Sequence, residues 1–103
     1  MQAKAAIDIR SVIDRAGPEL RAAGLSALYL FGSQARGDSR EDSDIDLAFD
    51  VAAEADENFS LLDQVRVQLR LQVLFGQKVD FIERRALRPR IRQRVEAEMV
   101  RLL

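Results

Sequence analysis

The stretch FGSQARGDSREDSDIDLAFD, from Phe31 to Asp50, decides the fold that we expect for this chain. An almost continuous apolar run, LSALYLF at 25–31, leads into it and predicts a strand that is covered on both faces. The stretch ends in DIDLAFDV at 44–51, which predicts a second strand. Its alternation places Asp44, Asp46 and Ala48 on one face and Ile45, Leu47 and Phe49 on the other.

Two acids thus share one face of the second strand, and a third acid lies further along the chain. Asp44 and Asp46 are two residues apart, which separates them by about 6.6 Å along the backbone. Asp80 stands among apolar neighbours in KVDFIE at 78–83, which predicts a third strand. If these strands pair, the three carboxylates converge, and each pair at about 6 Å repels by about 2 to 3 kcal/mol. A divalent cation would remove that repulsion.

The chain contains no histidine and no cysteine, which limits the chemistry open to it. Ser-His-Asp triads, Cys-His pairs and typical zinc sites are excluded. Carboxylate ligands alone favour Mg²⁺, Mn²⁺ or Ca²⁺, and two such ions could clamp the attacking and leaving oxygens of a phosphoryl or nucleotidyl transfer. An EF-hand is excluded as well, because Leu47 stands where its loop needs glycine.

The loop before the acidic strand is suited to phosphate. Gly32 lets the backbone approach a ligand closely, Ser33 offers a hydroxyl and an amide, and Arg36 can offset phosphate charge. The loop is not a P-loop, since the GxxxxGK[ST] spacing and its lysine are missing. We therefore expect the acids to hold metal and the turn to hold the phosphates that the metal binds.

The remaining sequence predicts helices packed on this small sheet. Apolar spacing indicates a helix at 3–16, which we expect Gly17-Pro18 to interrupt, and a second short helix that opens at Pro18 and closes at Gly24. Tyr29 is expected in the core of the first strand. A closing amphipathic helix is indicated by Leu87, Ile91, Val95, Met99 and Leu102. The order of elements predicts an α/β (α+β) fold with a mixed sheet of about three strands.

Residues 59–75 are ambiguous between strand and helix, because they alternate strictly in part and also carry helical stripes. Seventeen residues without a turn signal favour a helix. One apolar stripe comprises Leu61, Leu62, Val65, Leu69 and Val73. A second, at Val67, Leu71 and Leu74, would lie on the far side, covered either by a terminal helix or by an oligomer or partner.

Composition indicates one domain, at 1–103, in an intracellular setting. The net charge of −1 and the pI near 5.5 give the chain no overall attraction to nucleic acid or anionic membrane. No apolar run approaches the about 20 residues of a membrane span, and no signal peptide is evident. We expect a cytoplasmic protein. Six arginines between 84 and 94 form either a solvated helix face or a surface for phosphate or an acidic partner.

The segment LFGSQARGDSREDSDIDLAFD, followed by KVDFIE, resembles the minimal nucleotidyltransferase family within the DNA polymerase beta-like superfamily. That family combines glycine-serine, a gap of about ten residues, an Asp-x-Asp strand and a third acid on a later strand. The resemblance implies that Gly32 and Ser33 contact the triphosphate. It also implies that Asp44 and Asp46 bind two Mg²⁺ ions, and that Asp80 completes the metal site and helps to deprotonate an acceptor hydroxyl.

The resemblance also implies a partner. Minimal nucleotidyltransferases commonly occur with a helical HEPN-type toxin, act as its antitoxin and in some cases add AMP from ATP to its tyrosine. Direct binding of nucleic acid is not expected. Two alternatives stay open: a non-catalytic antitoxin that works by binding alone, and a small-molecule nucleotidyltransferase. Homo- or hetero-oligomers are both compatible with the sequence.

Overall fold

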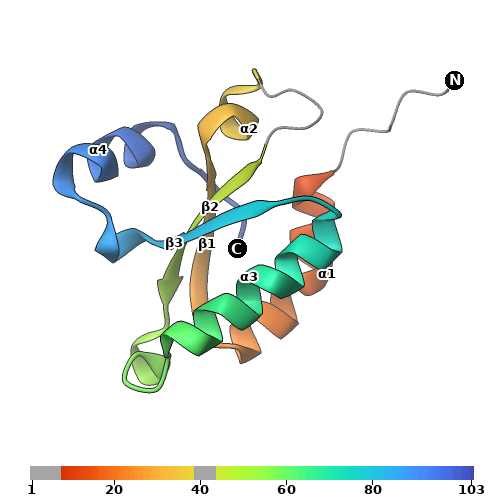
Figure 1. The fold of residues 1–103 in the computed structure, drawn as a ribbon, viewed down its shortest axis with the longest axis vertical. Coiled ribbons are helices and arrows are strands. Elements are labelled where there is room, and N and C mark those ends of the chain that lie inside the picture. Colours follow the sequence, from red (N-terminus) through yellow and green to blue (C-terminus); the bar gives the residue numbers. More distant parts are fainter. Residues whose placement is uncertain (1–7, 39–43) are drawn as a thin grey trace, which may run out of the picture.

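A computed structural model describes residues 8–38 and 44–103, and it has the expected mixture of helices and strands (Figure 1). The sheet has four strands in the order β3-β2-β1-β4. Their bounds are β1 Leu25–Phe31, β2 Ile45–Val51, β3 Val79–Glu83 and β4 Val100–Arg101. β2 is antiparallel to β1 and parallel to β3, while β4 is antiparallel to β1. The predicted α/β class is confirmed, with one strand more than the three expected.

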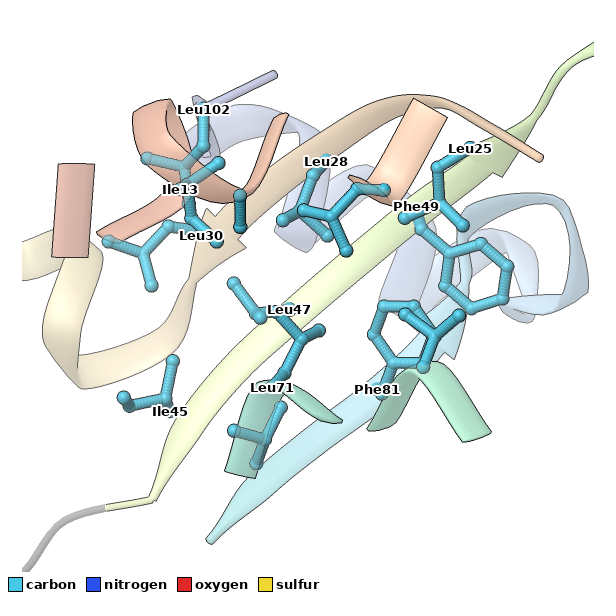
Figure 2. Packing of buried hydrophobic residues seen from close by; sticks show 14 of the residues in the cluster. Ile13, Leu25, Leu28, Leu30, Ile45, Leu47, Phe49, Leu71, Phe81 and Leu102 are labelled. Carbon is cyan, nitrogen blue, oxygen red and sulfur yellow. The ribbon is translucent and has the colours of Figure 1, made fainter. Parts of the chain in front are cut away.

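Helices lie on both sides of the sheet. α1 (Ile9–Ala22) and α3 (Leu61–Phe75) cover one face, α4 (Pro89–Glu98) lies on the other side, and the short α2 (Gly32–Arg36) follows the end of β1 (Figure 1). The main core lies between the sheet and the first pair of helices, and its labelled side chains interdigitate in Figure 2. A smaller cluster of Ala27, Tyr29, Ala48 and Val95 lies under α4, which confirms the core position of Tyr29. Two short 3₁₀ turns, Ala53–Ala55 and Arg84–Ala86, complete the described elements.

The first helix does not break at Gly17-Pro18, contrary to the expectation of two separate helices. α1 runs through Pro18 to Ala22, and the Asp8 side chain caps its start by accepting a hydrogen bond from Ser11 N at 3.1 Å. One face of the helix buries Ile13, Ala16, Gly17 and Leu20. The burial of this face offsets the loss of the backbone hydrogen bond that proline cannot form, so the helix stays continuous. Residues 3–7 of the expected helix lie outside the described residues.

The third helix is confirmed, but its orientation is the reverse of the one expected. Val67, Leu71 and Phe75 face the core, so Val67 and Leu71 form no partner surface. The other stripe, which was expected to lie against the sheet, is exposed; it comprises Leu61, Leu62, Val65, Leu69 and Val73. A capping box of Ser60 and Asp63 starts the helix, and Gly76, with φ of +69°, ends it.

Three glutamines of α3 bind the outer strand of the sheet. Gln64 and Gln68 donate to the carbonyls of Phe81 and Val79 at 3.1 and 2.9 Å, and Val79 N donates to Gln72 at 3.1 Å. β3 is an edge strand, and these bonds satisfy backbone groups that would otherwise be open to another chain. They also fix which side of α3 faces the sheet.

The closing helix ends earlier than the apolar spacing predicts. α4 stops at Glu98, and Val100 and Arg101 pair with Leu30 and Tyr29 as β4. Leu102 then donates its N–H to the Leu28 carbonyl at 2.7 Å and is buried in the main core. If α4 continued to Leu102, the pairing of Val100 and Arg101 with β1 would be lost. None of the helices in the described part of the chain combines the length and apolarity needed to cross a bilayer.

Candidate active site

The parallel pairing of β2 and β3 brings two of the three predicted acids together. Asp46 lies directly beside Asp80 in the register, and their side chains share a hydrogen bond. Asp44 directly precedes β2, and its carboxylate lies 3.7 Å from the Lys78 ammonium group. Among the described residues, no three acidic side chains lie close enough together to hold a metal ion. The structure therefore presents an adjacent pair of carboxylates with Asp44 at its margin.

The electrostatics of Asp46 are those of a site with too much negative charge. Its pKa is raised to about 6, first by burial, then by its hydrogen bond to Asp80 and the charges of Asp80 and Asp44. Arg36 opposes this effect and lowers the same pKa. Asp46 therefore keeps its proton at mildly acidic pH. A cation beside the pair would favour the doubly ionised form.

Gly32 is required by its position against Asp46. Its φ of +73° lies in the left-handed region, and a Cβ built there would overlap the Asp46 carboxylate and lie 3.1 Å from its Cγ. The turn at the end of β1 can therefore approach the acidic strand closely only with glycine. Ser33 follows in the first turn of α2 and lines the same cavity as Asp46.

Glu98 at the end of α4 organises this turn. Its carboxylate accepts a hydrogen bond from Gly32 N at 3.0 Å and pairs with the Arg36 guanidinium at 3.2 Å. The Gly32 N–H, and after it the Arg36 charge and hydrogen bond, lower the pKa of Glu98, although its partial burial acts in the opposite direction. Arg36 also pairs with Asp38 at 3.2 Å. The arginine predicted to offset phosphate is thus held by two carboxylates.

A cavity of about 500 Å³ joins these groups and is within the range typical of small-molecule sites. Its walls come from the β1–α2 turn, from Asp46 and from α4, which contributes Ile91, Arg94, Val95 and Glu98. Arg94 is one of the six arginines for which the sequence allows phosphate binding, but no sequence pattern singled out Glu98. The spacing of 91, 95 and 98 places Glu98 on the same helix face as Ile91 and Val95, which were interpreted only as apolar packing residues.

The donor set fits a divalent cation rather than a soft metal. Asp46 and Asp80 offer adjacent carboxylate oxygens, and a cation bound there would oppose the burial and the carboxylate charges that raise the pKa of Asp46. Asp44 could join them by exchanging its exposed ion pair with Lys78, which is worth little in solvent. The residues that would hold Mg²⁺ are therefore Asp46 and Asp80, with Asp44 as the third ligand.

Comparison with known proteins agrees with this arrangement. Residues 20–103 match the model of the family described as Polymerase beta, Nucleotidyltransferase. The chain belongs to this nucleotidyltransferase family. Within the family it resembles the protein adenylyltransferase MntA of Thermococcus cleftensis, with 33% identity over 94 residues that cover 90% of this chain and 91% of the relative.

Two solved structures show the same fold. One, provisionally described as a minimal nucleotidyltransferase, is 35% identical, has a TM-score of 0.73, and is matched over 94% of this chain and 98% of its own. The other contains a tri-AMPylated HEPN toxin of Shewanella oneidensis in complex with its MNT antitoxin. It is 20% identical with a TM-score of 0.64, and the match covers 92% of this chain and 72% of that one. The minimal nucleotidyltransferase fold predicted from the acidic strand is thereby confirmed.

Proposed function

We propose that this nucleotidyltransferase moves AMP from ATP, with Mg²⁺, to a tyrosine hydroxyl of a HEPN-type toxin and acts as its antitoxin. The observation that carries the proposal is the register of β2 and β3, which sets Asp80 beside Asp46, and Asp46 lines the cavity together with Gly32 and Ser33. The naming of MntA as a protein adenylyltransferase and the AMPylated toxin in the Shewanella oneidensis complex support the acceptor class.

Each group has a role that its position supports. Ser33 and the Gly32 turn would hold the triphosphate, and Arg36 and Arg94 would offset its charge at the opening beside α4. Bound Mg²⁺ would supply charge neutralisation at the phosphates and lower the pKa of the acceptor hydroxyl. The acceptor oxygen forms a bond to the α-phosphorus as the bond to pyrophosphate breaks. In this proposal Asp80 would take the hydroxyl proton.

The test is transfer of label from α-³²P-ATP to the purified toxin. Asp44→Asn combined with Asp46→Asn should abolish labelling, while Glu57→Gln, which removes one exposed charge far from the site, should leave it intact. The intact mass of the toxin should rise by one AMP or a multiple. Labelling that persists in the double variant would refute the assigned roles.

Neutralisation by binding alone is the second candidate, and one observation favours it. α3 presents a long exposed apolar stripe on the side of the sheet away from the cavity. A catalytically dead double variant that still neutralises the toxin at a one-to-one ratio would support this candidate. Neutralisation that requires ATP and intact acids would exclude it.

A further inference from the structure

The outer face of α3 carries most of the large apolar side chains that are exposed among the described residues. The described residues include eight exposed large apolar side chains, and five of these lie on α3. They are Leu61, Leu62, Val65, Leu69 and Val73, with exposed fractions of 74, 58, 39, 55 and 72%. We call these five residues the α3 stripe. Single exposed apolar residues are common on proteins, but a continuous row of them marks an interaction site.

The spacing of the α3 stripe is that of a helix–helix seam. From Leu62 its members follow at intervals of three, four and four residues, which keeps them on one side of the helix. The opposite side, at Val67, Leu71 and Phe75, is fully occupied by the core. A partner that lies along this row must itself present a regular row of apolar side chains, which an amphipathic helix does.

Charges beside the α3 stripe distinguish between possible partners. One flank carries Arg66 and Arg70, and a hollow of about 350 Å³ between α1 and α3 adds Arg15 to the same side. Arg70 pairs with Glu19 at 2.8 Å, and Asp63, one turn before Arg66 on the same flank, interacts electrostatically with Arg66. The other flank consists of the glutamines that bind β3. Three arginines against the two acids Glu19 and Asp63 leave one net positive charge on the arginine flank, while the glutamine flank is neutral.

This asymmetry disfavours a second copy of the chain. An antiparallel pair of α3 helices around a two-fold axis brings each flank against its own counterpart, so that Arg66 and Arg70 would face Arg66 and Arg70 of the other copy. The arginines of the two copies would repel each other and weaken such a dimer. An amphipathic helix with acidic residues beside its apolar row would bring opposite charges together instead.

We propose that the α3 stripe is the docking surface for an amphipathic, acid-flanked helix of the protein acceptor. The inference rests on the proposed function, because that function supplies the acceptor. α3 and the cavity lie on opposite sides of the sheet, so docking on α3 leaves the cavity open to ATP and to the acceptor hydroxyl (Figure 1). The surface that holds the partner is separate from the groups that modify it.

The first experiment measures binding of the purified HEPN-type toxin by titration calorimetry. Leu69→Glu places a charge in the middle of the α3 stripe and should weaken binding by at least about 30-fold, as for a central interface residue. Gln93→Glu adds the same charge at an exposed position of α4 and should leave affinity unchanged. ATP binding and the far-ultraviolet circular dichroism spectrum should be unaltered in both variants. Equal affinity of Leu69→Glu and wild type would overturn the proposal.

The second experiment tests the charge and the identity of the occupant. Arg66→Glu should weaken binding of the toxin by about tenfold and remove part of its salt dependence. Light scattering should find the isolated wild-type chain monomeric. Unchanged affinity of Arg66→Glu would refute the acidic flank, and a dimer of the isolated chain that Leu69→Glu dissociates would assign the stripe to a second copy.

The two proposals fail in different ways. If Leu69→Glu loses toxin binding but wild type transfers no label, the docking surface stands and the proposed reaction fails. If Leu69→Glu labels the toxin with an unchanged KM, the reaction stands and the docking surface fails. Label transfer and affinity therefore report on separate parts of the molecule.

Discussion

Replacing Asp46 with asparagine should make the metal-free protein more stable while it removes the transferase reaction. The pKa of Asp46 stands at about 6 against an ordinary value of 3.8. A displacement of that size corresponds to at most about 3 kcal/mol between folded and unfolded states at neutral pH. Asp46 is only partly buried, so solvent screening reduces the expected gain in the free energy of unfolding to about 1 kcal/mol.

The raised pKa of Asp46 also determines how the free energy of unfolding changes with pH. The folded protein holds the Asp46 proton more tightly than the unfolded chain, so the contribution of this group is most favourable at low pH. Its contribution to the free energy of unfolding should therefore fall as pH rises from about 4 to about 6 and be level above that. The Asp46→Asn variant should lack this pH-dependent contribution to the free energy of unfolding.

Urea denaturation followed by circular dichroism in EDTA, at pH values from 4 to 8, measures both effects. Mg²⁺ should then stabilise the wild type at pH 7 and have little effect on Asp46→Asn, because a ligand stabilises only the state that binds it. Glu57→Gln is the matched control and should behave as wild type. A variant at Asp46 that is less stable than wild type in EDTA would refute the view that the acidic pair is strained.

Three further predictions concern the turn and the core. Gly32→Ala must adopt an unfavourable φ and displace the Asp46 carboxylate, so it should lower label transfer strongly and cost about 1 to 2 kcal/mol in urea denaturation. Glu98→Ala should weaken ATP binding by about tenfold, or about 1.4 kcal/mol, by releasing the turn. In the same calorimetric titration Glu98→Gln, which can still accept from Gly32 N, should lose less. Leu71→Ala, fully buried, should cost about 2 to 5 kcal/mol in urea denaturation, whereas an interface role alone would leave stability unchanged.

The sequence predicted the acidic strand and its turn because both depend on short-range rules. The alternation of 44–51 assigns Asp46 to one face, and Gly32 marks a backbone that must pass close to another group. The position of Asp80 beside Asp46 could be expected once β3 was recognised, but only the parallel register established it. The metal and phosphate roles of these residues are still predictions.

The orientation of α3 could not be derived in this way. Both of its faces carry apolar residues, so periodicity alone gives two nearly equal solutions. The deciding contacts are long-range: Gln64 and Gln68 bind backbone carbonyls of β3, and they flank the side that carries Val67 and Leu71. β4 was missed for a related reason, since its two residues are defined by pairing with β1.

The position of α4 shows how a polar network controls the site. Val95 is the only fully buried residue of this helix among the described residues, so packing alone holds it weakly. Arg84, just before α4, pairs with Asp50 at 2.9 Å and with Glu96 at 2.7 Å, and Tyr29 donates to Asp50 at 3.0 Å.

These partly buried bonds connect α4 to the sheet on the same face as Asp46. Because Glu98 lies two residues after Glu96, the same bonds determine where Glu98 meets Gly32. Removing Arg84 would leave Asp50 without its cation and allow α4 to shift, and the geometry of the Gly32 turn would change with it. The arginine-rich segment, which the sequence predicts to be either a solvated helix face or a surface for phosphate or an acidic partner, thus includes a residue that positions the Gly32 turn.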